Sequence, residues 1–270
     1  MKNKKIIYLI IASLMLVFSA CEPIVDEEHL SNTSDANGVE LKATNTTAGG
    51  NEIKLEMLTT GISGHWDYII GKALTDRATI LFPVTGKFNF AYRGTLGAEL
   101  FEKKVEVTID KLDHPVPPEW GALLGADAVK GKTWVFYKDN PEVGGGGPLW
   151  WFMSPPDDPS SAMSAWWNAG ATCCPPVDAD GKMHFDLDGA ANYTHYATAN
   201  ATGAKGGFVL DVPGKRLIIN GGVELLGGAE AGDGSGVYQI ISLTNDKLVL
   251  WVNRGKKDAG TGWTFVFRPQ

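Results

Sequence analysis

Two pairs of adjacent tryptophans, Trp150-Trp151 and Trp166-Trp167, stand close together in the second half of the chain. Sugar rings present flat apolar C–H faces edged with hydroxyl groups, so a glycan site needs exposed aromatic planes and a few polar side chains. Adjacent side chains on a strand point to opposite faces, so we expect one tryptophan of each pair to be buried and the other to face solvent. Packing of all four in a core is the alternative, because tryptophan is highly buried on average.

Polar side chains near these pairs are the second requirement of a glycan site. Asp139, Asn140 and Asn168 fall in predicted loops close to the tryptophans in sequence, although each also suits an ordinary turn. Trp251 precedes a polar loop and fits either a core or a ligand surface. The candidate glycan-binding residues are Trp150, Trp151, Trp166, Trp167, Asn168, Asp139, Asn140 and Trp251.

A metal site is only weakly indicated. Asp178 and Asp180 offer the oxygen ligands that calcium prefers, but the spacing of helix-loop-helix calcium sites is missing. The five histidines are scattered along the chain and suggest no metal centre. We expect no cofactor, with a structural calcium ion at Asp178 and Asp180 as the alternative.

Catalytic patterns are missing from the second half of the chain. A glycosidase needs two carboxylates across a cleft, and the glutamates here (Glu119, Glu142, Glu224 and Glu230) stand in no aromatic strand motif. No G-x-S-x-G pattern of a serine hydrolase occurs. We therefore expect no catalytic residues and no enzyme activity.

The elements that must position these residues are strands. The chain has 33 glycines, and no helical period extends beyond two or three turns after residue 20, which predicts an all-β fold with many turns. Cys173 and Cys174 are adjacent, and we expect them to stay unbridged because a bridge between neighbours is strained. The net charge of -7 and the pI near 5.3 exclude nucleic acid as the main partner.

Alternating runs predict a small antiparallel sandwich over 39–111, with strands at 52–57, 66–70, 78–82, 87–92 and 103–109. The segments GHWDY at 64–68, FPVTGKF at 82–88 and VEVTI at 105–109 resemble the PKD-like immunoglobulin modules of surface lipoproteins. The resemblance implies a spacer domain in which Trp66 belongs to the core.

Three prolines, Pro115, Pro117 and Pro118, place a hinge at 112–118. Eight short strands are expected in a second domain over 119–270, at 133–137, 150–153, 183–187, 208–212, 216–219, 238–243, 247–252 and 263–268. Eight strands favour a jelly-roll-like sandwich, with a closed barrel as the alternative. The predicted fold is all-β, with two β-sandwich domains: one immunoglobulin/PKD-like and one jelly-roll-like.

The start of the chain has the layout of a secretory signal. Lysines precede an apolar run and then small residues, so we expect residues 1–20 to be removed. Phe18-Ser19-Ala20-Cys21 resembles a bacterial lipobox, which implies that Cys21 carries the lipid and that 21–38 is a tether. The acidic stretch at 22–28 is similar to surface-export signals of Bacteroidota-type lipoproteins. The alternative to the lipobox is an ordinary signal peptide with a chance cysteine. The alternative to the export signal is a solvated linker.

The sequence of the second domain resembles the C-terminal domain of lipoproteins encoded with polysaccharide-uptake systems. The similar segments are GKTWV at 131–135, FDLDG at 185–189, GGFVLDV at 206–212 and IISLTNDKLVL at 240–250. The resemblance implies an outer-membrane, cell-surface location and a TonB-dependent transporter complex as partner. We expect a non-catalytic lipoprotein that captures polysaccharide or oligosaccharide for uptake. The alternative is a surface adhesion or structural lipoprotein that binds a protein. A glycoside hydrolase is the third and least favoured interpretation.

Overall fold

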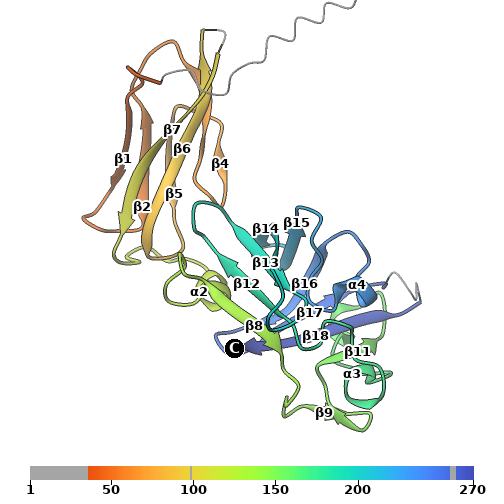
Figure 1. Ribbon diagram of the computed structural model, residues 1–270. Helices are drawn as coiled ribbons and strands as arrows, with labels where there is room; N and C mark the ends of the chain where they lie inside the picture. Colours follow the sequence, from red (N-terminus) through yellow and green to blue (C-terminus); the bar gives the residue numbers. More distant parts are fainter. Residues whose placement is uncertain (1–35, 98, 256–259) are drawn as a thin grey trace, which may run out of the picture.

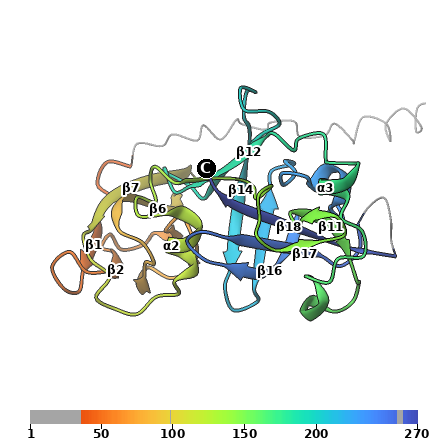
Figure 2. The same ribbon diagram turned by 90° about the horizontal axis from the view of Figure 1, so that it is seen from below.

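The computed structural model describes residues 36–97, 99–255 and 260–270 (Figure 1). The expected signal peptide at 1–20, Cys21 and the tether as far as residue 35 lie outside the described residues. Strands make up most of the regular structure, which confirms the all-β prediction. They form a sandwich followed by a closed barrel, and helix α2 (Glu119–Leu124) lies between the two in both views (Figures 1 and 2).

The sandwich consists of two antiparallel sheets. The three-stranded sheet has the order β1 (Leu41–Asn45), β2 (Glu52–Met57), β5 (Arg77–Leu81). The four-stranded sheet has the order β4 (Lys72–Ala73), β3 (Ser63–Asp67), β6 (Gly86–Leu96), β7 (Glu99–Ile109). β6 and β7 pair along their whole length and form one long hairpin.

Apolar residues at alternate positions fill the space between these sheets, as a half-buried strand pattern predicts. Ile53 and Leu55 of β2 are fully buried, and so are Trp66 and Tyr92 from the opposite sheet. The rings of Trp66 and Tyr92 meet edge-on at 5.4 Å, and Trp66 Nε1 donates to the carbonyl of Asp76 at 3.1 Å. Trp66 is therefore a core residue, as expected.

The barrel is an antiparallel meander, in which each strand pairs with the next one along its order. The order is β8 (Lys132–Phe136), β12 (Lys182–Asp186), β13 (Asn192–Tyr196), β14 (Ala204–Asp211), β15 (Arg216–Asn220), β16 (Val237–Leu243), β17 (Leu248–Val252) and β18 (Gly262–Pro269). The C-terminal half of β18 pairs with β8, through Phe267 opposite Phe136 and Pro269 opposite Trp134. This last pairing closes the sheet.

The expected jelly-roll-like sandwich is therefore wrong for the second half of the chain, which forms the closed barrel instead. A jelly roll passes between two sheets, whereas here neighbouring strands pair in sequence order. Closure depends on pairing between 134–136 and 267–269, a contact that local periodicity cannot reveal. The eight strands of the barrel also differ from the eight predicted ones, because β13 was not among the predicted strands.

Side chains fill the inside of the barrel, as eight strands allow. Trp134, Phe185, Tyr193, Phe265 and Phe267 are all fully buried in the main core cluster. Helix α2 packs against this core, where the carbonyl of its Leu123 accepts a hydrogen bond from Trp134 Nε1 at 3.0 Å. The short helix α4 (Gly228–Ala231) follows Leu225 and Leu226, which are buried in the same cluster.

A long excursion over 137–181 connects β8 to β12. It contains β9 (Val143–Gly144), β10 (Gly147–Pro148), β11 (Trp151–Ser154), the 3-10 helix η1 (Pro159–Ser161) and α3 (Ala169–Thr172). β11 pairs with the N-terminal half of β18. A second apolar cluster joins the excursion to β17 and β18, through Leu149, Phe152, Val249 and Val266. Strand β17 is consequently buried at every position.

Candidate binding site

Trp166 and Trp167 are exposed, with 58% and 41% of their surface accessible to solvent. Two adjacent tryptophans at this exposure are unusual, because tryptophan is highly buried on average. The structure thus brings one of the two predicted pairs to the surface. It exposes both members of that pair rather than one.

The main chain of Trp166 and Trp167 is fixed to the edge of the barrel sheet by Met153 of β11. Trp166 N donates to the carbonyl of Met153 at 2.8 Å, and Met153 N donates to the carbonyl of Trp167 at 2.9 Å. The Trp167 ring meets the buried Trp263 edge-on at 6.4 Å. An exposed aromatic surface is therefore held on an ordered backbone.

Asn168, the next residue, is almost completely buried. Its side-chain amide donates to the carbonyl of Gly144 at 2.7 Å and to those of Gly147 and Pro148 at 3.1 Å. Its side-chain oxygen caps α3 by accepting from Ala171 N at 3.4 Å. The expectation that Asn168 binds sugar hydroxyls is wrong for this geometry, since its polar atoms face the protein.

The glycine-rich segment that Asn168 holds is a tight hairpin. Gly144 pairs with Gly147, so Gly145 and Gly146 form a two-residue turn. Their φ angles are +58° and +97°, as in the primed turns that require left-handed backbone at both central positions. Glycine at both positions thus follows from the turn itself.

Trp150 and Trp151 are both buried, so the expectation that one of them faces solvent is wrong. The Trp150 ring packs edge-on against Phe136 at 5.0 Å, and the Trp151 ring lies 4.5 Å from that of Trp263. Strand alternation fails as a guide here because Trp150 precedes β11, and both rings pack in the main core cluster.

The remaining glycan candidates do not gather beside Trp166 as polar ligands. Asn140 is buried, and its side chain donates to the carbonyl of Leu149 at 2.5 Å. Trp251 is buried and donates from Nε1 to Ser154 Oγ at 3.0 Å. The exposed carboxylate of Asp139 lies 3.3 Å from Arg268 Nε. Asn140 and Trp251 are therefore structural residues, contrary to expectation.

The two weak metal candidates point to different partners. Asp178 is buried and accepts the backbone N–H of Gly227 at 2.9 Å, with His195 Nε2 also at 2.9 Å. Asp180 is exposed and pairs with Lys138 at 2.5 Å, which lowers the pKa of its carboxyl. Among the described residues, no group of three or more histidine, cysteine, aspartate or glutamate side chains is arranged to hold a metal ion.

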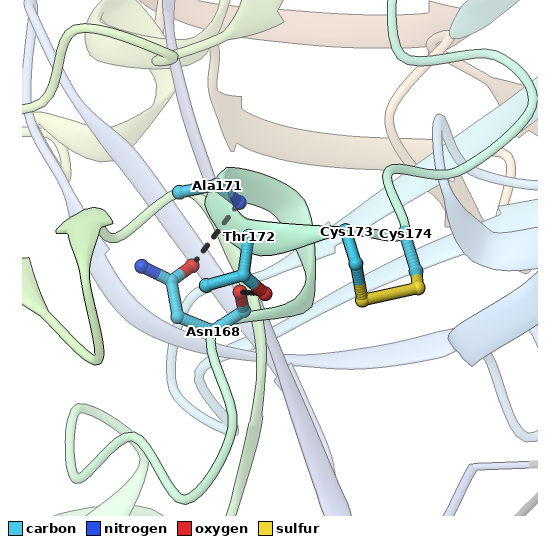
Figure 3. The surroundings of a disulfide bond; sticks show 5 residues. All are labelled: Asn168, Ala171, Thr172, Cys173 and Cys174. Carbon is cyan, nitrogen blue, oxygen red and sulfur yellow. Dashed lines mark hydrogen bonds between the residues drawn. A yellow bond between two sulfur atoms is a disulfide. The ribbon is translucent and has the colours of Figure 1, made fainter.

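Cys173 and Cys174 form a disulfide between neighbouring residues, so the expectation that they stay unbridged is wrong (Figure 3). They follow α3 directly, and both are exposed, as is Pro175. The only signal in the sequence is the Cys-Cys pair itself, in a chain predicted to be exported, where disulfides persist.

A charged pair lies in the loop that follows β11. Asp157 binds Arg254 at 2.7 Å, and its backbone N–H donates to the side chain of Asn253 at 2.6 Å. Hydrogen bonds from Arg254 and Asn253 lower the pKa of the Asp157 carboxyl. This carboxylate is thus held ionised, and it is poorly suited to give up a proton as a general acid.

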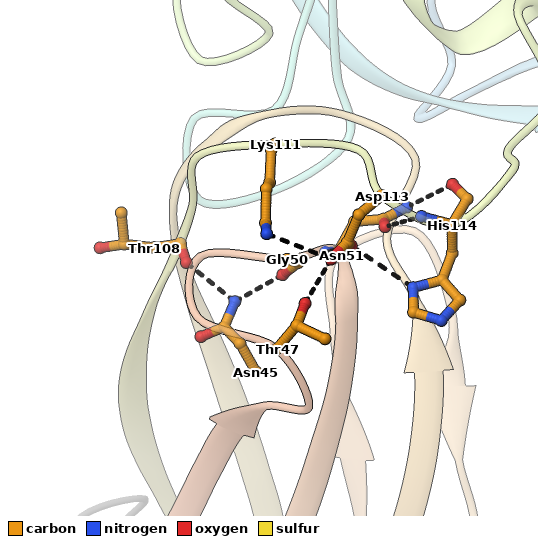
Figure 4. A network of polar contacts seen from close by, with 8 residues as sticks. All are labelled: Asn45, Thr47, Gly50, Asn51, Thr108, Lys111, Asp113 and His114. Atoms are coloured by element: carbon orange, nitrogen blue, oxygen red, sulfur yellow. Dashed lines mark hydrogen bonds and ion pairs between the residues drawn. The ribbon is translucent and has the colours of Figure 1, made fainter.

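A separate polar network joins the sandwich to the linker that leads to the barrel (Figure 4). Asp113 accepts hydrogen bonds from the Thr47 hydroxyl and from Asn51 N, the latter at 3.2 Å. The bond from Thr47 is the main cause that holds the pKa of Asp113 well below its usual range. Asn51 in turn accepts from His114 N at 2.9 Å.

A hollow of about 700 Å³ lies on the sandwich, away from Trp166 and Trp167. Strands β3, β6 and β7 line it, with His65, Arg93, Leu100 and Glu102 among the lining residues. Arg93 is already paired with Glu102 at 2.7 Å and with Asp67 at 3.4 Å. No local pattern indicates this hollow, because its lining comes from three strands.

Within the described ranges, no helix is both long enough and apolar enough to cross a membrane. The exposed pair Trp166 and Trp167 is the part of the predicted site that the structure places at the surface on a fixed backbone. Comparison of the chain with protein-family models and with curated proteins gives no match.

Proposed function

We propose that this chain is a non-catalytic, lipid-anchored surface protein that binds glycans through Trp166 and Trp167 and captures them for uptake. The observation behind the proposal is the exposure of both rings on a backbone held by Met153. Exposed aromatic planes stack on the apolar faces of sugar rings. A preformed surface of this kind lowers the entropic cost of binding.

A carboxyl group that precedes the pair in sequence, that of Asp157, supports binding rather than hydrolysis. A glycosidase requires one carboxylic acid whose pKa is raised, so that it can protonate the leaving group. Asp157, in the loop after β11, has its pKa lowered by Arg254 instead. The proposal therefore includes no catalytic residue and no cofactor.

Affinity electrophoresis of the protein from Glu22 onward tests the proposal. The gels contain β-glucan, α-glucan, mannan, xylan or pectin. We expect one of these polysaccharides to retard the protein, and Trp166→Ala or Trp167→Ala to weaken the retention about tenfold or more, as loss of a dominant contact does. Leu74→Ala, at an exposed apolar position of the sandwich, is the matched control. No retardation by any polysaccharide would rule out the proposal.

The surface location rests on the lipobox resemblance at Cys21. Cys21→Ser is expected to release the protein from the membrane fraction of the host cell, since it removes the proposed site of acylation. Protease added to intact cells should then degrade the wild-type protein but leave a periplasmic marker untouched. Co-purification with a TonB-dependent transporter would support a role in uptake, whereas a protease-resistant wild type would contradict the surface location.

A surface adhesion protein is the second candidate, and the hollow on the sandwich favours it. Leu96 and Leu100 are exposed beside it on the β6–β7 hairpin. Exposed apolar groups around a hollow are typical of protein contacts. If this role holds, Leu100→Asp should abolish capture of a protein partner while both Trp166→Ala and Trp167→Ala leave capture intact.

A further inference from the structure

We infer that the disulfide Cys173–Cys174, together with Pro175, forms a second contact surface for the glycan, and that this glycan is uncharged. The inference rests on the proposed function and extends it in two ways. It adds contact residues that lie outside the tryptophan pair, and it narrows the class of ligand.

The first observation is the chemistry of the surface. Cys173, Cys174 and Pro175 are all exposed. Oxidation removes both thiol groups, so neither side chain ionises, and what remains is soft, polarisable sulfur. The proline ring beside it is apolar and has a fixed φ angle. An apolar surface with little internal freedom suits the C–H face of a sugar.

The second observation is that the protein holds this segment from both sides. On the N-terminal side, Cys174 N donates to the carbonyl of Ala169 at 2.9 Å. The Thr172 hydroxyl donates to the carbonyl of Asn168 at 2.6 Å (Figure 3). On the C-terminal side, Val177 N donates to Glu230 at 2.7 Å. Binding to a segment that is already ordered costs less conformational entropy.

The third observation is proximity to the tryptophans. Between Trp167 and Cys173 the chain contains only Asn168 and the one-turn helix α3. At 1.5 Å per residue, the four residues of this helix rise by about 6 Å. Asn168 is the N-cap of that helix and also follows Trp167, so one buried residue fixes the spacing of the two surfaces.

The fourth observation is that the segment itself contains no charged residue. From 159 to 177 the sequence contains no aspartate, glutamate, lysine, arginine or histidine. Recognition of a carboxylate or a sulfate normally uses arginine or lysine in charge-assisted hydrogen bonds. The segment that contains both surfaces offers no such partner, so an uncharged polysaccharide fits it better than a uronic-acid or sulfated one.

The test uses the whole protein from Glu22 onward and the polysaccharide that retards it. The double variant Cys173→Ser/Cys174→Ser is expected to bind about three- to tenfold more weakly. Its thermal midpoint and the fluorescence of its tryptophans should match the wild type, which excludes displacement of Trp166. Carboxymethylation of the same polysaccharide is expected to weaken binding of the wild type as well, because it adds charge without changing the backbone.

A second variant covers the case in which the double variant does not fold. Pro175→Glu leaves the disulfide intact and places a charge on the surface, and we expect it to weaken binding of the neutral polysaccharide. Val209→Glu adds the same charge to an exposed position on β14 and should have no effect.

The outcomes separate the two proposals. Loss of binding in Trp166→Ala with wild-type affinity in both the cysteine and the Pro175 variants would overturn the second surface and leave the proposed function standing. Equal or tighter binding of the carboxymethylated polysaccharide would overturn the neutral class. Failure of the wild-type protein to bind any polysaccharide overturns both proposals together.

Discussion

The side-chain amide of Asn168 donates to the backbone carbonyl of Gly144 at 2.7 Å, across 24 residues of sequence. The exposed Trp167 precedes Asn168 immediately, so a buried residue holds a surface one in place. The same amide reaches Gly147 and Pro148, which ties the β9–β10 hairpin to the start of α3. The polar side chain that the sequence offers as a sugar ligand instead orders the loop that presents the aromatic rings.

Asn168→Ala is therefore expected to lower the free energy of unfolding by about 1–3 kcal/mol, because it leaves three partly buried carbonyls without this donor. It should also weaken glycan retention, although Asn168 has no exposed polar atom to offer a ligand. Urea unfolding and affinity electrophoresis measure the two effects. Asn89→Ala, at an exposed position of β6, is the control, and equal stability of the two variants would contradict this role.

The two tryptophan pairs should respond in opposite ways to truncation. Trp150→Ala removes a buried ring that packs against Phe136, and we expect a loss of about 3–5 kcal/mol in the free energy of unfolding. Trp166→Ala removes a largely exposed ring, and we expect a change within about 0.5 kcal/mol. Thermal and urea unfolding measure both. Similar losses at Trp150 and Trp166 would contradict the burial difference.

Local sequence patterns predicted the strands better than their arrangement. Alternation placed β2, β6, β16 and β17 close to their observed positions, because the side-chain period of a strand is visible over a few residues. Closure of the barrel was not visible, since it depends on Phe136 meeting Phe267 from the far end of the chain. The segment at β13 was missed altogether.

The binding candidates were predicted only in part, for a related reason. Trp166 is exposed and Trp151 is buried, although each belongs to an adjacent pair of tryptophans. The local sequence pattern therefore cannot tell the two apart. What separates them is packing against residues distant in sequence, because the Trp151 ring lies against Trp263 in the main core cluster. The disulfide at Cys173 was missed because strain was taken to exclude it, although the adjacent cysteines were noted.

Asp113 should make the sandwich sensitive to acid. Its folded pKa lies below the ordinary value of 3.8 because Thr47 and Asn51 donate to it. A depressed folded pKa contributes stability that is fully present above pH 3.8 and is lost as the pH falls toward the folded pKa. We expect Asp113→Asn to be less stable than the wild type at neutral pH and to approach it at about pH 2.

Urea unfolding across this pH range, monitored by a spectroscopic signal from the sandwich, measures the difference in stability. Glu99→Gln, at an exposed carboxyl of β7, should run parallel to the wild type at all pH values. Thr47→Ala provides an independent check, since it removes the largest contribution to the low pKa of Asp113 and keeps the carboxyl. A constant gap between wild type and Asp113→Asn from neutral to acid pH would contradict the role of this network.

Ser154 connects the barrel to the excursion that presents the tryptophans. Its hydroxyl oxygen accepts from Trp251 Nε1 at 3.0 Å and lies 3.1 Å from the Thr264 hydroxyl, all of it buried. Ser154→Ala leaves the indole N–H without its partner, so we expect a loss of about 1–3 kcal/mol in the free energy of unfolding.

Ser63→Ala, at an exposed position of β3, should stay within about 0.5 kcal/mol of the wild type. Because Met153 precedes Ser154 and pairs with Trp167, hydrogen exchange at the amides of Met153 and Trp166 should also rise in Ser154→Ala. Unchanged exchange at these two amides would mean that the buried hydroxyl stabilises the barrel without ordering the surface beside it.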